Sequence, residues 1–230
     1  MQFARYRRHP SSGTRLIGAP FCRRTANELR SAIPTGTVCR VPDNDSLLPL
    51  LTEESSRETA AKVGVPDALA KLNVFRLLDR RPTLAKGAAD LLLSMLVGAT
   101  LDARLRELVI MRVAWTTRSA YEWAQHYRIA TDLGVSQGDL TGVRDPERWS
   151  FDPQAVAVIK AADEVARHGE VEVGTVELLR QLLGDDAALE VVAAIATWTM
   201  VSTLLRSFRV PLDPDLVAWA PDGRGPEGTP

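Results

Sequence analysis

The segment RSAYEWAQH, residues 118–126, places three side chains that can carry or hold protons within eight residues. Ser119 and Glu122 are three residues apart, and Glu122 and His126 are four apart, so a helix would present them on roughly one face. A carboxylate and an imidazole can serve as acid and base near neutral pH. The same serine and glutamate also match the S-x-x-E capping box, in which the glutamate bonds its own backbone. From these residues alone, both interpretations stay open.

The helical pattern on either side of this segment brings a second carboxylate towards it. Apolar residues recur at helical spacing over residues 101–117, and Asp102 can cap the start of that helix. If the chain reverses near Thr117, Glu107 lies ten residues before the turn and His126 lies nine after it. Two antiparallel helices joined by a short turn would therefore place Glu107 close to His126.

Helical spacing of apolar residues continues through most of the chain beyond residue 45, and no alternating strand pattern is visible. The sequence therefore predicts an all-α fold of about eight helices in one domain, residues 46–212. We expect residues 1–45 to be a basic, disordered extension, because residues 1–42 hold eight arginines and one acid. The proline- and glycine-rich end, residues 213–230, is expected to be a disordered tail.

Composition narrows the class of protein. A net charge of -1 argues against nucleic-acid binding through a general basic field. The apolar run over residues 187–205 includes Glu190 and hydroxyl side chains, which favours a buried core helix over a membrane span. Cys22 and Cys39 form neither a disulfide framework nor a metal motif, and no secretory apolar segment precedes them. We therefore expect a cytoplasmic protein with no metal site.

The segments LDARLRELVIMRVAW and YEWAQHYRIATDLGVS, followed by AADEVARHGEV and TVELLRQLLG, resemble the carboxymuconolactone decarboxylase and alkylhydroperoxidase D family. The resemblance covers roughly residues 60–210. It implies an alkylhydroperoxidase D-like helical fold, a small-molecule substrate, no cofactor, and a homo-oligomer that is a trimer, a hexamer or a dimer. In the peroxidase branch a CxxC would fall on Ser119 and Glu122. Neither residue can form a disulfide or react with peroxide, so thiol peroxidase activity is disfavoured.

The decarboxylase branch needs no dithiol: it acts on a lactone bearing a carboxylate, releases CO2 and protonates carbon. The resemblance therefore implies a lyase or isomerase acting by proton transfer, with Glu107, Glu122 and His126 as its catalytic residues. Two alternatives remain, a peroxidase that uses Cys22 or Cys39, and a non-catalytic helical oligomer that binds a ligand.

Four further residues are candidates for substrate binding. Ser119 and Trp123 adjoin the catalytic candidates, and Arg112 and Arg118 carry the charge that a substrate carboxylate would need. Each has an alternative role: a helix cap for Ser119, a core residue for Trp123, and surface ion pairs for the two arginines.

Overall fold

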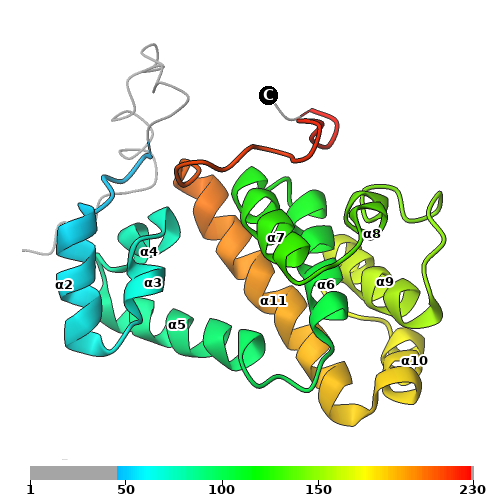
Figure 1. Ribbon diagram of the computed structural model, residues 1–230. Helices are drawn as coiled ribbons and strands as arrows, with labels where there is room; N and C mark the ends of the chain where they lie inside the picture. The colour runs from blue at the N-terminus through cyan, green and yellow to red at the C-terminus, as the bar shows by residue number, and fades with distance from the viewer. Residues whose placement is uncertain (1–45, 229–230) are drawn as a thin grey trace, which may run out of the picture. The chain divides into compact units, whose positions relative to one another are not determined.

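The computed structural model describes residues 46–228, and every element in that range is an α-helix (Figure 1). The prediction of an all-α fold is confirmed, with ten helices among the described residues where the sequence indicated about eight. The proposed basic extension, Cys22 and Cys39 lie outside the described range. The helices are α2 Glu53–Val63, α3 Asp67–Ala70, α4 Asn73–Leu78, α5 Pro82–Leu96, α6 Ala103–Thr116, α7 Ala120–Asp132, α8 Gln137–Gly142, α9 Pro153–His168, α10 Val173–Leu183 and α11 Asp185–Ser207.

Helix boundaries fall where the sequence provides capping side chains. Asp102 caps α6 by accepting a hydrogen bond from the Leu105 amide, and Asp152 caps α9 in the same way from Ala155. These bonds satisfy backbone donors that have no partner inside the helix, and each cap is worth about 1 kcal/mol. Helix α2 is followed by its C-cap Gly64, whose φ of 78° lies in the left-handed region that favours glycine.

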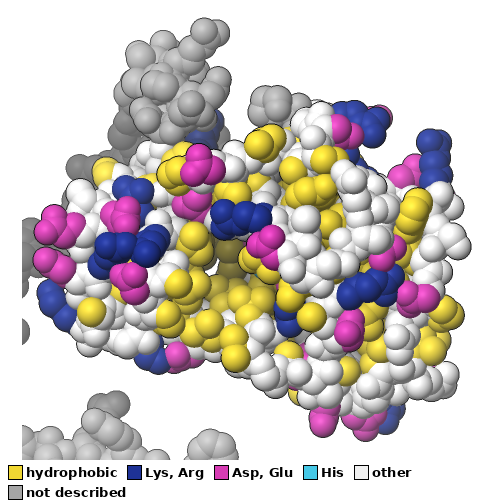
Figure 2. Space-filling view, in the orientation of Figure 1, with side chains coloured by type: hydrophobic (Ala, Val, Ile, Leu, Met, Phe, Trp, Pro, Cys, Tyr) yellow, Lys and Arg dark blue, Asp and Glu magenta, His cyan; other side chains and the backbone are white. Residues whose placement is uncertain are grey.

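Helix α11 runs between two groups of helices, α2–α5 on one side and α6–α10 on the other (Figure 1). Its first half packs against α6, α9 and α10, and its second half contributes Val201 and Leu205 to a hydrophobic cluster with α2, α4 and α5. A hollow lined by hydrophobic side chains opens near α5 and α11 on the face shown in Figure 2. By length and composition α11 is the one described helix that could span a membrane. Its packing is that of a core helix, as the sequence predicted.

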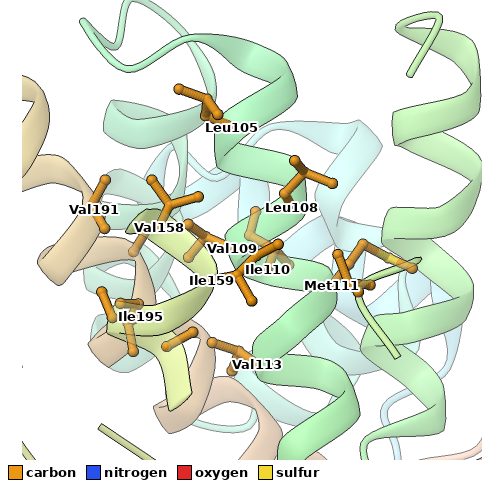
Figure 3. Packing of buried hydrophobic residues seen from close by; sticks show 14 of the residues in the cluster. Leu105, Leu108, Val109, Ile110, Met111, Val113, Val158, Ile159, Val191 and Ile195 are labelled. Carbon is orange, nitrogen blue, oxygen red and sulfur yellow. The ribbon is translucent and has the colours of Figure 1, made fainter. Parts of the chain in front are cut away.

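The main hydrophobic core surrounds α6, which is buried along nearly its whole length. Figure 3 shows how Leu108, Val109 and Ile110 of α6 lie among Ile159 of α9 and Ile195 of α11. Burying one such side chain contributes about 1.5–3 kcal/mol. This all-round burial fixes the position of α6, and therefore of Glu107, relative to the helices that pack against it.

Residues 213–228, which composition predicted to belong to a disordered tail, contact the helices in the structure. Trp219 is 5% exposed, and its ring lies 5.8 Å from that of Trp115 and 5.9 Å from that of Trp123. Trp123 Nε1 donates a hydrogen bond to the carbonyl of Ala220 at 2.8 Å. Residues 213–228 form no helix, and the buried ring of Trp219 is what attaches them to the helices. Their proline and glycine content gives no indication of this contact.

Candidate active site

The predicted hairpin between α6 and α7 is confirmed. Helix α6 ends at Thr116 with Thr117 as its C-cap, and α7 starts after its N-cap Ser119, with Arg118 between the two caps at a φ of 57°. His126 Nδ1 and Glu107 Oε2 are 2.7 Å apart. Glu107 is fully buried and His126 nearly so. The carboxylate that the spacing placed opposite the imidazole is thus directly bonded to it.

Both ring nitrogens of His126 are occupied. Trp198 of α11 donates its indole N–H to His126 Nε2 at 2.9 Å. Because an indole nitrogen can only donate, Nε2 must be the acceptor, and the ring hydrogen lies on Nδ1, facing Glu107. Glu107 also accepts a hydrogen bond from Arg106 Nε at 3.2 Å. His126 is therefore oriented as a neutral imidazole between a carboxylate and an indole.

Only half of the capping box forms. The Ser119 hydroxyl accepts the Glu122 amide at 3.5 Å, but the Ser119 amide bonds Ala114 and leaves the Glu122 carboxyl free of the backbone. Instead, Ser202 of α11 donates to Glu122 Oε2, and Thr117 lies 2.9 Å from Ser202. The two interpretations of Ser119 and Glu122 therefore separate: the serine caps the helix, and the glutamate faces the protein interior.

Glu122 is a carboxyl group that burial keeps protonated. It is 2% exposed, and the loss of solvent raises its pKa to about 8, while hydrogen bonds from Ser202 and Ser119 act in the opposite direction. At neutral pH the protonated acid therefore predominates. Oε2 is bonded to Ser202, and Oε1 has no hydrogen-bond partner among the described residues.

Glu122 and His126 line an apolar cavity of about 140 Å³ between α3–α5, α7 and α11. The hydrophobic hollow in Figure 2 lies over the α5 and α11 side of this region. The residues lining the cavity include no lysine, arginine or aspartate. A cavity of this composition suits a small, largely apolar molecule.

The polar groups of the cavity wall, apart from Glu122, already have partners. Tyr121 and Gln125 both donate to the buried carboxylate of Asp213, and the Gln125 carbonyl accepts from Arg128 at 3.2 Å. Both nitrogens of His126 are bonded as well. Oε1 of Glu122, which is itself buried, is the one side-chain polar atom among these lining residues that has no hydrogen-bond partner in the described structure.

The structure does not bring the other four candidates to this cavity. Ser119 is the buried cap of α7, and Trp123 is fully buried, 5.3 Å from the ring of Trp115. Arg112 binds both carboxylate oxygens of Asp163, at 2.6 and 3.0 Å, and the carbonyl of Val143. Arg118 is exposed and lines a separate pocket. Their role in substrate binding stays a prediction.

Sequence reasoning missed the contribution of α11. Trp198 and Ser202 are four residues apart, the same spacing as Glu122 and His126. Because Trp198 bonds His126 and Ser202 bonds Glu122, the two pairs match across antiparallel helices. The equal spacing of the two pairs would have suggested that they could bond each other. Nothing in the sequence, however, indicates that α7 and α11 are neighbours.

Comparison with known proteins agrees with this architecture. Residues 82–164 match the model of the Carboxymuconolactone decarboxylase family. No curated protein matches the sequence. The fold is similar to an alkylhydroperoxidase AhpD core protein from Ralstonia eutropha, described as an uncharacterized peroxidase-related protein, with a TM-score of 0.60 and 19% identity over 74% of this chain and 93% of that one.

Two further solved structures share the fold. An uncharacterized peroxidase-related protein from Silicibacter sp. has a TM-score of 0.59 and 14% identity, over 78% of this chain and 97% of that one. The debrominase Bmp8, solved in complex with a tribromopyrrole, has a TM-score of 0.58 and 15% identity, over 74% and 95%. Residues 82–164 thus match the carboxymuconolactone decarboxylase family model, and the fold of the described chain is that of AhpD-like helical proteins.

Proposed function

We propose that this protein catalyses proton transfer to carbon in a small, largely apolar molecule, as a lyase or isomerase, with Glu122 as the proton donor. The proposal depends on one observation: Glu122, which lines an apolar cavity, is a buried carboxyl group with a raised pKa of about 8 and one oxygen without a hydrogen-bond partner. A protonated carboxyl in such a place can donate at neutral pH, where an ordinary glutamate is ionised.

The chemistry divides between three residues. The ionised form of Glu122, which is the minor form at neutral pH, removes a proton from the carbon beside a carbonyl, and the electrons of the broken C–H bond form an enolate. The protonated Glu122 then returns the proton to the same carbon or to another carbon of the enolate, and the bond from Ser202 to Oε2 stabilises the carboxylate form of Glu122. His126 forms part of the cavity wall and takes no part in the proton transfer, since its two nitrogens are hydrogen-bonded to Glu107 and Trp198. Return of the proton to carbon restores the ionised Glu122, so that exchange and isomerisation need no second proton donor.

The composition of the cavity bears on the substrate class. A lactone that carries a carboxylate would need a cation, because burying an unpaired charge costs several kcal/mol or more. The cavity wall provides no lysine or arginine. Of the two arginines predicted for this purpose, Arg112 is bound to Asp163 and Arg118 lines a separate pocket. A neutral carbon acid, such as a cyclic ketone, an enone or an uncharged lactone, therefore fits better than the carboxylated lactone of the sequence-based hypothesis.

The two alternatives have less support. Peroxide reduction needs a thiol, and residues 46–228 contain no cysteine. A purely structural or ligand-binding role would fit a Glu122 held in its own cap and a Glu107 apart from His126, and neither arrangement is present. A variant lacking both Cys22 and Cys39 tests the first alternative, because retained thiol-independent turnover would exclude a role for these residues.

Homo-oligomer formation, which the resemblance implies, remains a proposal. Large apolar side chains near the cavity are exposed, among them Leu84 at 51% and Met200 at 40%, and both line the cavity. Association of these side chains between subunits would close the cavity from water. Sedimentation of the full chain measures the assembly directly, and a monomer at micromolar concentration would contradict the proposal.

Hydrogen–deuterium exchange at carbon tests the proposed proton transfer on its own, whatever the complete reaction is. Small cyclic ketones, enones and lactones are incubated with the protein in D2O, and exchange at carbon is followed by NMR. Glu122→Gln should slow the exchange at least about 100-fold, because it removes the transferable proton and keeps the shape. Glu164→Gln is the matched control, since Glu164 is equally buried but bonds Thr175 away from the cavity. Equal exchange rates in the wild type and Glu122→Gln would contradict the proposal.

A further inference from the structure

A second pocket lies at the start of α7 and has the opposite character to the apolar cavity. Its volume is about 490 Å³, and Arg118, Arg206 and Arg209 line it without any acidic residue. Tyr121 and Leu205 line both this pocket and the apolar cavity, so the two are neighbours across these side chains. A concave site with three guanidinium groups and no carboxylate is suited to an anion.

The three arginines are available to a ligand. All three are exposed, and none has a side-chain hydrogen bond or ion pair within the part of the chain that the structure describes. Several other arginines among the described residues are held in ion pairs, for example Arg104 with Asp139 and Asp152. Arg118 comes from the α6–α7 turn, whereas Arg206 and Arg209 come from the end of α11, so the tertiary fold gathers them from distant positions.

The backbone of the same pocket adds donors that point to the same kind of ligand. Ala120 and Tyr121 are the first two residues of α7 and line the pocket, and their amides have no acceptor among the described residues. The Ser119 hydroxyl takes the Glu122 amide and leaves these two unpaired. Free amides at the start of a 13-residue helix favour negative charge through hydrogen bonding and the helix dipole.

We infer that this pocket binds the phosphate or carboxylate group of a small molecule, independently of the reaction proposed for the apolar cavity. Each arginine guanidinium can donate two parallel hydrogen bonds to two oxygens of such a group. The backbone amides of Ala120 and Tyr121 can donate to a third oxygen, or to the same oxygens from the opposite side. The pocket is a single compact cluster of cations on a chain with a net charge of -1, which fits a small anion and not an extended polyanion.

Titration of the full chain with inorganic phosphate and with succinate, at constant ionic strength, tests the site and distinguishes the two anion classes. The expected result is saturable binding of at least one of them, measured by calorimetry, and tighter than that of chloride. The double variant Arg118→Gln/Arg206→Gln should weaken this binding at least about tenfold. Arg81→Gln is the matched control, because Arg81 is also exposed and unpaired within the described residues but lies outside the pocket.

The wild-type protein provides a second measurement that needs no variant to fold. Binding at this site should shift the amide NMR signals of Ala120 and Tyr121 along the same saturation curve that calorimetry gives. The inference is overturned if phosphate and succinate bind no better than chloride. It is also overturned if Arg81→Gln weakens binding as much as the double variant does, or if the two amide signals stay in place while anions bind elsewhere.

Discussion

Replacing Glu122 by glutamine should change how the stability of the protein depends on pH. The folded protein holds a proton on Glu122 up to a pKa of about 8, whereas the unfolded chain releases it near the ordinary value of 4.5. Below pH 4.5 both states are protonated, and Glu122 then adds no pH dependence. Between the two values only the folded state keeps the proton, so the stability contributed by the protonated group is lost as pH rises.

The size of the effect follows from the separation of the two pKa values. Each pH unit between them costs about 1.4 kcal/mol, so the loss reaches about 3 kcal/mol at pH 7 and about 5 kcal/mol above pH 8. Glutamine has no proton to lose, and its amide oxygen can still accept from Ser202. The free energy of unfolding of Glu122→Gln, relative to that of the wild type, should therefore rise with pH by the amount that the wild type loses. Burial of the glutamine N–H groups adds a difference that does not depend on pH.

Chemical denaturation of both proteins from pH 5 to 9 measures this difference. Other titrating groups occur in both chains and cancel in the comparison, so the change with pH isolates Glu122. We expect the difference in free energy of unfolding to rise with pH and to level off above about pH 8. A difference that stays constant over this range would refute the conclusion that Glu122 is buried as a neutral acid.

Three further predictions concern the groups around the site. Trp198→Phe keeps an aromatic ring but removes the indole N–H and part of a buried side chain, so it should cost at least about 1 kcal/mol of unfolding free energy and shift the NMR signal of His126 Nε2; an unchanged signal would contradict the bond. Glu107→Ala leaves His126 and the buried Arg106 without their acceptor and should cost about 3 kcal/mol or more in denaturant unfolding. Asp213→Ala removes the acceptor of a tyrosine hydroxyl, a glutamine amide and a backbone N–H, and should also lower the free energy of unfolding by about 3 kcal/mol; a loss below about 1 kcal/mol would show that the tail is not held there.

The parts of the fold that sequence predicts well are those determined by local chemistry. The caps at Asp102 and Asp152 and the left-handed glycine at Gly64 all occur where residue type requires them. The bond between Glu107 and His126 was predictable for the same reason, because a short turn between two helices fixes which residues lie opposite one another.

The remainder depends on contacts between distant segments. Trp198 reaches His126 across 72 positions of the chain, and Ser202 reaches Glu122 across 80. The order of the tail likewise depends on Asp213 and Trp219, which find partners in α4, α6 and α7. Composition describes each of these segments alone and carries no information about which neighbour it will meet.

The most direct test of Glu122 as the proton donor is a titration of its carboxyl group. Carbon-13 NMR of the side-chain carboxyl, assigned by comparison with Glu122→Gln, reports its protonation between pH 4 and 10. We expect a midpoint near the raised pKa of about 8, the value at which a buried glutamate remains a proton donor at neutral pH. A midpoint near the ordinary glutamate value of 4.5 would show an ionised carboxylate and contradict the proposed role of Glu122.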